Sequence, residues 1–247
     1  MTASLSPEEI ERYARHIVIR DIGGPGQLKL KKAHVTVIGA GGLGSPAILY
    51  LAAAGVGTLR IIDDDTVSVS NLQRQIIQKT AAIGERKASV AADAVGSLNP
   101  NTAVQTVAKR LTANNAEECL KETHIVIDGT DSLETRTEIA TACEQLEIPL
   151  VTAAVSVWDG SLTVIAPHRR SEVGTRYPRF GDVFPDAANA TALPTCAEVG
   201  VVGALTGMLG TMQAMEAIKL ITGAGQPLLG RLLLVDALTM RFEVMQL

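Results

Sequence analysis

Cysteine is scarce in this 247-residue sequence, which contains only Cys119, Cys143 and Cys196. Their odd number and wide spacing argue against a disulfide framework and favour a reducing compartment. No basic segment followed by an apolar run opens the sequence, so no signal peptide is predicted. A formal net charge of −4 gives no support for general nucleic-acid binding. We therefore expect a soluble, cytoplasmic protein that does not bind nucleic acid.

A long hydrophobic run is also missing, apart from the uncharged residues 199–215. That stretch is at the lower limit for spanning a membrane and carries four glycines, so we expect a buried helix there and no membrane anchor. Hydrophobic residues nevertheless make up 47% of the sequence, which is enough for a sizeable core. The length suits one large domain or two small ones.

The strongest pattern lies at residues 35–44, where an apolar, β-branched run leads into closely spaced glycines. Gly39, Gly41 and Gly44 have the G-x-G-x-x-G spacing of a strand, a tight turn and a helix. In that pattern the first glycine permits the turn, the second lets a ligand approach the backbone, and the third lets the helix pack on the strand. Asp63 follows the next apolar run at a distance that suits a ribose hydroxyl. The pattern predicts an adenine-nucleotide site without saying which nucleotide binds.

The rest of the sequence predicts an α/β fold, with a Rossmann-like, mostly parallel sheet that continues into an antiparallel C-terminal half. The proline-rich segment 167–194 has no clear period and is predicted to be a long crossing loop. The other expected elements are a helix over 6–20, a turn cluster at 23–26, a helix over 87–96, a turn at 159–160, a glycine-interrupted helix ending near 221, and strands over 35–38, 59–62, 103–107, 124–128, 149–154, 161–165, 232–235 and 242–245.

Carboxylates follow several of the predicted strands, and ligands of an open parallel sheet collect beyond the carboxyl ends of its strands. Asp63, Asp128 and Asp131 are all expected at that edge. Asp131 is better placed than Asp128 to hold magnesium because it lies beyond the strand; alternatively it only caps the next helix. The loop 63–75 is rich in groups that bind nucleotide or metal, but Asp-rich turns are common and Arg74 could simply pair with a carboxylate.

Several segments together resemble the MoeB/ThiF/HesA family, the bacterial relatives of ubiquitin-activating enzymes. The resemblance runs from about residue 5 to the C-terminus, and the loop Asn71-Leu72-Gln73-Arg74-Gln75 is its most specific part. It implies a single adenylation domain over 1–247, with an N-terminal helix (5–20), a nucleotide-binding half (32–155) and a half for the carrier and the crossing loop (156–247). The segments that carry the resemblance are Arg12-Tyr13-Ala14-Arg15, Gly39–Gly44, Asp63-Asp64-Asp65, Ser70–Gln75, Lys87, Gly129-Thr130-Asp131, Cys196–Gly200 and Gln213–Lys219.

The family uses ATP to adenylate the C-terminal glycine of a ubiquitin-like sulfur carrier protein, and it releases pyrophosphate. The resemblance therefore implies a carrier of the MoaD or ThiS type with a C-terminal Gly-Gly, acting in molybdopterin or thiamine biosynthesis. Because the reaction brings a carboxylate against the α-phosphate, the site must supply cations and align the groups. No G-x-x-x-x-G-K-[ST] motif occurs, so ATP would be held without a Walker loop.

Each role carried over from the family falls on a residue that matches its motif. Arg74 and Lys87 would neutralise the phosphates, Asp131 would hold Mg²⁺, and Asn71 would orient phosphate or substrate. Arg15 would reach into the ATP site of a partner subunit, which implies a homodimer; without the resemblance, Arg15 reads as part of a solvated helix face. The implied nucleotide-binding set is Gly39, Gly41, Gly42, Gly44, Asp63, Asp65, Asn71, Arg74, Gln75, Lys87 and Asp131.

The sequence departs from the family's pattern in its cysteines. Many members bind a structural zinc through two C-x-x-C pairs, but the crossing loop here reads Tyr177-Pro178-Arg179-Phe180 and no such pair follows it. We therefore predict no zinc. Cys196 lies where some members carry a thiol that links to the carrier; a small buried residue is the favoured interpretation. Cys119 and Cys143 are interpreted as ordinary helix residues.

Three other functions are compatible with parts of the pattern. The glycine motif alone would allow an NAD-dependent oxidoreductase, although Arg74, Lys87 and Asp131 suit a triphosphate and a metal rather than hydride transfer. A related enzyme could adenylate a peptide or a tRNA base. A non-catalytic scaffold is the least favoured, because the charged set is intact.

Overall fold

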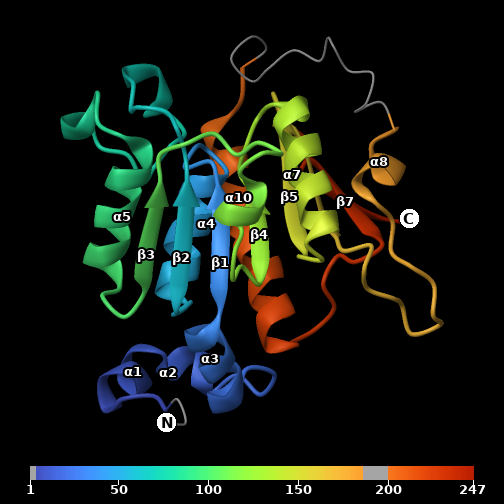
Figure 1. The fold of residues 1–247 in the computed structure, drawn as a ribbon, viewed down its shortest axis with the longest axis horizontal. Coiled ribbons are helices and arrows are strands. Elements are labelled where there is room, and N and C mark those ends of the chain that lie inside the picture. Colours follow the sequence, from blue (N-terminus) through green and yellow to red (C-terminus); the bar gives the residue numbers. More distant parts are fainter. Residues whose placement is uncertain (1–3, 186–199) are drawn as a thin grey trace.

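The computed structural model describes residues 4–185 and 200–247, and within these ranges the chain forms one eight-stranded sheet (Figure 1). The strand order is β3-β2-β1-β4-β5-β6-β7-β8. The pairs from β3 to β5 are parallel, and those from β5 to β8 are antiparallel, which confirms the predicted fold class. The strands are β1 (His34–Ile38), β2 (Thr58–Ile62), β3 (Ala103–Val107), β4 (Ile125–Asp128), β5 (Leu150–Ser156), β6 (Asp159–Ile165), β7 (Arg231–Asp236) and β8 (Arg241–Gln246).

Helices cover both faces of the parallel half. One hydrophobic core packs against α4 (Gly44–Ala53), α5 (Lys87–Leu98) and α10 (Gly203–Thr222). A second core, on the other face, packs against α6 (Ala116–Cys119), α7 (Leu133–Gln145) and α8 (Phe180–Val183). In β4, Ile125 and Ile127 belong to the first core and Val126 to the second, because successive side chains of a strand point to opposite faces. Burial on both sides explains the continuous apolar runs of the central strands.

Three helices lie below the amino ends of the strands in Figure 1: α1 (Pro7–Arg12), α2 (Ala14–Ile17) and α3 (Gly23–Lys32). The helix predicted over 6–20 begins as expected, with the Ser6 side chain accepting a hydrogen bond from the Glu9 amide. It breaks at Tyr13, which is 4% exposed and whose hydroxyl accepts a 2.8 Å hydrogen bond from Asn99 Nδ2. The predicted helix is thus two short helices that meet at a buried Tyr13.

The turn cluster predicted at 23–26 is wrong, because these residues form the first turn of α3. Pro25 lies in the first helical turn, where a backbone N–H has no intrahelical partner to lose. A Cβ on Gly26 would lie 2.9 Å from Ile22 Cγ2 and 3.5 Å from Thr222 Cγ2, so the glycine lets α3 pack closely. A contact with residue 222 leaves no signal in the sequence around residue 26.

Two further expectations change in detail. The hairpin between β5 and β6 turns at Val157 and Trp158, and the predicted turn residue Asp159 instead pairs with Ser156. In the crossing loop the described part contains α8, and the remainder falls outside the described residues. The two short 3₁₀ helices, η1 (Val69–Asn71) and η2 (Thr80–Ala82), lie in the loop between β2 and α5. Among the described residues, no helix has the length and apolar character needed to cross a membrane.

Candidate nucleotide site

The carboxyl ends of β1, β2 and β4 meet at one edge of the sheet, around a cavity of about 240 Å³. This edge is the one predicted to bind ligand. The groups that line the cavity come from the ends of five strands, the loop before α5, and the start of α10. They are Ile38, Gly39, Gly41, Gly42, Leu43, Ile62, Asp63, Asp64, Asp65, Arg74, Gln75, Lys87, Lys109, Arg110, Leu111, Gly129, Thr130, Asp131, Ser132, Thr135, Val155, Val201 and Thr206.

The glycine turn between β1 and α4 forms one wall of this cavity. Gly39 has a φ of +88°, and a Cβ on Gly44 would lie 1.8 Å from the carbonyl oxygen of Gly39. These two positions therefore require glycine for the turn and for the contact of helix with strand. Around Gly41 the nearest atoms to an added Cβ are 3.8 Å away, so its wall of the cavity is open to a ligand. Gly42 also lines the cavity, whereas Gly44, expected in the nucleotide-binding set, does not.

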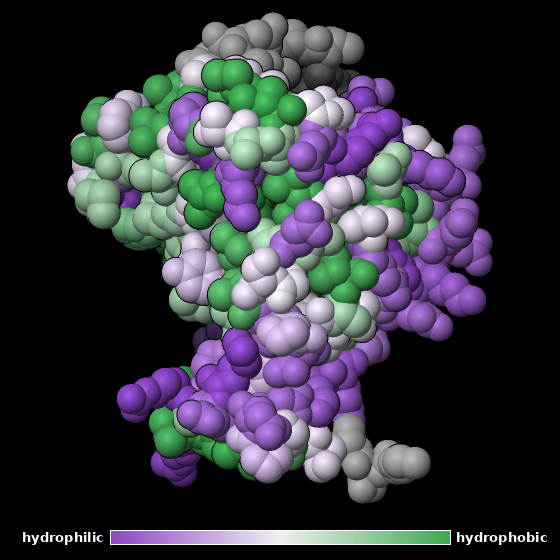
Figure 2. All heavy atoms as spheres, turned by 90° about the vertical axis from the view of Figure 1, so that its left-hand side faces the viewer, coloured by the Kyte–Doolittle hydropathy of each residue, from purple (hydrophilic) through white to green (hydrophobic). Residues whose placement is uncertain are grey.

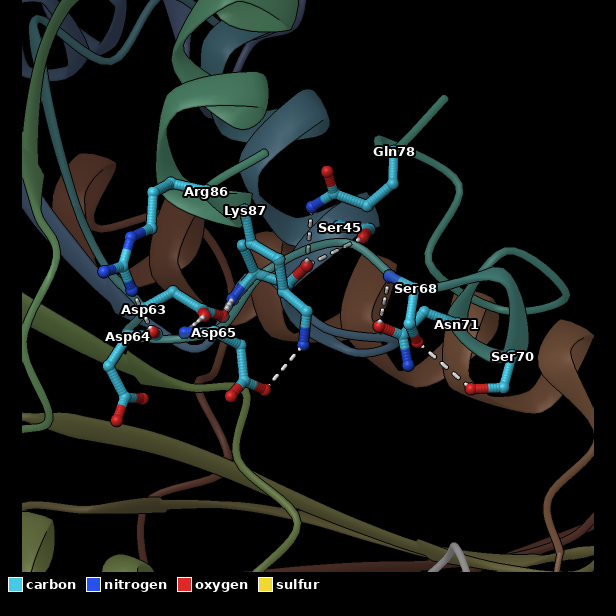
Figure 3. A network of polar contacts seen from close by, with 11 residues as sticks. Ser45, Asp63, Asp64, Asp65, Ser68, Ser70, Asn71, Gln78, Arg86 and Lys87 are labelled. Atoms are coloured by element: carbon cyan, nitrogen blue, oxygen red, sulfur yellow. Dashed lines mark hydrogen bonds and ion pairs between the residues drawn. The ribbon is translucent and has the colours of Figure 1, made fainter. Parts of the chain in front are cut away.

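Asp63 is fixed at the end of β2 by two backbone amides. Its Oδ2 accepts a 2.7 Å hydrogen bond from Ala40, and its Oδ1 accepts a 2.9 Å bond from Asp65. Burial raises the pKa of the Asp63 carboxyl, although both amide donors act in the opposite direction. The carboxylate is thus rigid and partly desolvated, and Figure 3 shows it beside Asp65 and Lys87.

Two cations of the cavity come from the loop after β2 and from the first residue of α5. Lys87, the first residue of α5, is 5% exposed, and its Nζ lies 2.7 Å from Asp65 Oδ2 (Figure 3). Arg74 donates a 3.1 Å hydrogen bond to the Ser70 carbonyl, and no carboxylate of the described residues pairs with it. The alternative that Arg74 only pairs with a nearby carboxylate is therefore wrong within the described part of the chain.

The neighbouring amides differ in how they are placed. Asn71 does not line the cavity; its Oδ1 accepts a 3.3 Å hydrogen bond from the Ser68 amide and so caps η1. Gln75 lines the cavity, and its side-chain oxygen is buried with no hydrogen-bond partner among the described residues. A buried, unpartnered oxygen at a cavity wall is a candidate ligand contact.

The two carboxylates at the end of β4 have different environments. Asp128 is fully buried and accepts hydrogen bonds from the Thr130 amide (3.0 Å), the Thr130 hydroxyl (2.7 Å) and the Thr152 hydroxyl (2.7 Å). Asp131 is exposed at the cavity and makes no hydrogen bond or ion pair with the described residues. The helix cap is Ser132, so the alternative in which Asp131 caps α7 is wrong.

Comparison with known sequences decides the family, because residues 13–247 match the ThiF family model. The chain belongs to the ThiF family. It is 42% identical over 236 residues to a Thermus thermophilus protein named sulfur carrier protein adenylyltransferase, covering 96% of this chain and 86% of that one. It is 41% identical over 243 residues to the SAMP-activating enzyme E1 of Haloferax volcanii, covering 98% and 87% of the two chains.

Some ThiF relatives are much longer than this chain. The Mycobacterium tuberculosis protein named probable adenylyltransferase/sulfurtransferase MoeZ is 42% identical over 241 residues, which are 98% of this chain but 61% of that protein. Among solved structures, PaaA superposes with a TM-score of 0.79 at 24% identity, over 100% of this chain and 76% of that one. Escherichia coli MccB with ATP gives 0.77 at 20% identity, over 95% and 71%. These structural likenesses show the ThiF fold.

The structure does not bring Arg15 to the cavity, and it leaves the role of the cysteines to be considered one by one. Arg15 is exposed on α2, which lies at the amino ends of the strands and so at the opposite end of the sheet from the cavity (Figure 1). Cys196 lies outside the described residues. Cys119 and Cys143 are free and buried, in α6 and α7, which agrees with their interpretation as ordinary helix residues.

Two cations that line the cavity were not predicted. Lys109 and Arg110 come shortly after the end of β3, and Arg110 Nη2 donates a 2.8 Å hydrogen bond to the Thr135 hydroxyl. Their position beyond the carboxyl end of a strand was the signal that could have identified them. Among the described residues, no group of three or more His, Cys, Asp or Glu side chains could hold a metal ion. The absence of zinc stays a prediction, since Cys196 is outside that set.

Proposed function

We propose that this protein uses ATP to adenylate the C-terminal glycine of a ubiquitin-like sulfur carrier protein, with release of pyrophosphate. The observation that carries the proposal is the cavity at the strand ends, which joins an open glycine wall, a fixed ribose-type carboxylate and the cations Arg74 and Lys87. The names of the Thermus and Haloferax relatives, at about the same length as this chain, support the same reaction.

The cavity suits ATP as a substrate. Asp63 would accept hydrogen bonds from the ribose hydroxyls, and the phosphates would lie over Gly41 at the start of α4. Arg74 would bind phosphate oxygens through its forked guanidinium, while Lys87 supplies a compact charge. Lys87 is already paired with Asp65, which is exposed, so phosphate binding exchanges one anionic partner of Lys87 for another.

The reaction then needs alignment more than acid–base catalysis. A carboxylate oxygen of the carrier's terminal glycine attacks the α-phosphorus, and the bond from that phosphorus to the oxygen bridging to the β-phosphate breaks. Pyrophosphate leaves with the electron pair, and the product is an acyl-adenylate; no proton has to move. The cations lower the repulsion between the two approaching anions, and the fixed walls hold them in line.

Magnesium fits the residues of the site through Asp131. Its carboxylate is exposed at the cavity and free of protein partners among the described residues, whereas the oxygens of Asp128 already accept three hydrogen bonds. Mg²⁺ is commonly held by one or two carboxylates together with substrate phosphates. When bound there, it would supply positive charge to the phosphates of the leaving group.

Arg15 would complete the site from a second copy of the chain. In its own subunit it is exposed and at the opposite end of the sheet from the cavity, which favours a role in trans. Mixing Arg15→Ala and Lys87→Ala subunits tests the homodimer. In a mixed dimer one site keeps its own Lys87 and receives an intact Arg15, so activity returns. Two inactive variants that remain inactive after subunit exchange would refute the shared site.

ATP–pyrophosphate exchange tests the whole proposal. Exchange should depend on a Gly-Gly-ended carrier of the MoaD or ThiS type from the same cell, and it should disappear in Asp131→Ala. The carrier that works would also decide between the molybdopterin and thiamine pathways. ATP binding without exchange for any such carrier would refute the proposal and favour a peptide or tRNA acceptor instead. Tight binding of NAD in place of ATP would favour the oxidoreductase.

A further inference from the structure

The loop that carries Asp131 is held by a buried polar network. Asp128, at its start, uses its carboxylate to accept hydrogen bonds from the amide and hydroxyl of Thr130 and from the hydroxyl of Thr152 on β5. Asp128 is 0% exposed and Thr152 is 2% exposed. A buried carboxylate is stable only when its oxygens are satisfied, so the positions of its three donors are tightly constrained.

Arg136, which lies on α7, also contacts this loop. It is buried, its Nη2 donates a hydrogen bond to the Thr130 carbonyl, and its Nε lies 3.9 Å from Asp128 Oδ2. The guanidinium thus contacts the loop backbone and faces the carboxylate that organises it. A buried charge pair contributes little net stability, and its better-supported effect is to favour one arrangement over others.

The network reaches the opposite face of the sheet through α10. Gln213 Nε2 donates 2.7 Å and 3.2 Å hydrogen bonds to the carbonyls of Asp128 and Val151. Gly129 is packed as well, since an added Cβ would lie 2.8 Å from the Gly39 carbonyl oxygen. The loop backbone is therefore fixed from α7, β5 and α10 up to Thr130. Asp131, the next residue, has no partner of its own among the described residues.

We infer that Arg136, together with Asp128 and Thr152, positions Asp131 for the magnesium–nucleotide complex without touching the nucleotide. The inference rests on the proposed function, because it takes Asp131 as the group that receives Mg²⁺. Arg136 does not line the cavity, so it is a positioning residue. Its loss would loosen the loop at Thr130, directly before Asp131, and a displacement of about 1 Å in a catalytic group can cost about 100-fold in rate.

The test compares two variants with two matched controls. Arg136→Lys keeps the charge but loses the fork, and Thr152→Val removes one donor to Asp128 while keeping the side-chain shape. Arg60→Lys is the control for the first, because Arg60 also donates to main-chain carbonyls but lies away from the cavity. Thr163→Val is the control for the second, because Thr163 is buried opposite Thr152 on β6 and its hydroxyl donates to carbonyls.

Each variant is first checked for folding by thermal melting. The affinity for a non-hydrolysable ATP analogue is then measured with and without Mg²⁺, which needs no turnover. In Arg136→Lys and Thr152→Val, the factor by which Mg²⁺ increases the affinity for the analogue should be about tenfold smaller than in the wild type. ATP–pyrophosphate exchange should be slower by about 10- to 100-fold. Both controls should keep the wild-type tightening.

The inference is overturned if the two variants fold and Mg²⁺ tightens analogue binding as in the wild type. It is also overturned if the variants bind the analogue more weakly by the same factor with and without Mg²⁺. That result would mean that these residues stabilise the cavity as a whole and do not position Asp131. If Arg136→Lys does not fold, Thr152→Val decides. Failure of the proposed function shows separately, as a wild-type protein that binds the magnesium–analogue complex but catalyses no carrier-dependent exchange.

Discussion

Two glycines of the same turn should respond to alanine in opposite ways. At Gly44 an added Cβ would lie 1.8 Å from the Gly39 carbonyl oxygen and 2.9 Å from its carbon, so the backbone has to move. At Gly41 the nearest atoms are 3.8 Å away and φ is not in the left-handed region, so alanine fits the protein itself. The added methyl at Gly41 would instead enter the space proposed for the phosphates.

The magnitudes follow from these distances. Overpacking costs about 1–3 kcal/mol, and a clash between two backbone segments belongs at or above the top of that range. Gly44→Ala should therefore lower the melting temperature by about 6–12 °C, at about 2–4 °C per kcal/mol for a chain of this size. Gly41→Ala should leave the fold intact or stabilise it by about 0.4–1 kcal/mol. The same methyl should weaken ATP binding by about 5- to 150-fold, which corresponds to about 1–3 kcal/mol.

Thermal melting and titration calorimetry with ATP measure the two effects. Gly96→Ala is the control, because Gly96 is exposed in α5 and an added Cβ meets nothing within 4 Å. It should raise stability slightly and leave ATP binding unchanged. An unchanged dissociation constant in Gly41→Ala would mean that the phosphates do not approach this turn. An unchanged melting temperature in Gly44→Ala would refute the packing argument for the third glycine.

Three further outcomes are expected. Lys87→Met should weaken ATP binding by about 10- to 150-fold in calorimetry with little change in melting temperature, because the abandoned Asp65 is exposed; equal affinity would exclude a phosphate contact. Burial raises the pKa of Asp63, so between its unfolded pKa and its higher native pKa the native state binds the extra proton. The free energy of unfolding, measured by urea titration, should fall as pH rises across that window, and this fall should be absent in Asp63→Asn. The same pH dependence in both proteins would contradict the prediction. Burial also raises the pKa of the Cys143 thiol, so alkylation followed by peptide mass spectrometry at pH 8 should label Cys143 only after unfolding; native labelling would mean that α7 opens.

The sequence predicts the parts of this fold that are encoded locally. The run at 125–128 reads as a buried strand because both of its faces are covered, and the glycine turn at 39–44 reads correctly because its steric needs lie within six residues. The edge of the sheet that bears the cavity follows from topology alone, once the strands are taken as parallel. This reasoning was enough to place Asp63 and Asp131 at that edge, whereas Asp65 and Lys87 were assigned to the site through the resemblance to the family.

What the sequence leaves undetermined depends on distant contacts. Glycines at 23–26 are typical of a turn, yet in the fold they begin α3, where Gly26 lies against Ile22 and Thr222. Lys109 and Arg110 follow a predicted strand, but only the fold shows that their side chains line the cavity. Arg136 looks like an ordinary surface cation of α7, and its burial over Thr130 follows only from the fold.

The charges around the cavity give a reason for the parts that would come from outside the chain. Among the residues that the structure describes, four carboxylates and four cations line it, so this part of the site is close to neutral: Asp63, Asp64, Asp65 and Asp131 against Arg74, Lys87, Lys109 and Arg110. A nearly neutral site cannot balance both an ionised triphosphate and an approaching carboxylate, because bringing like charges together in a partly desolvated cleft is costly. Mg²⁺ at Asp131 and Arg15 from a second subunit would supply the missing positive charge. On this argument, the proposed Mg²⁺ and the proposed second subunit would both serve the charge balance of the reaction.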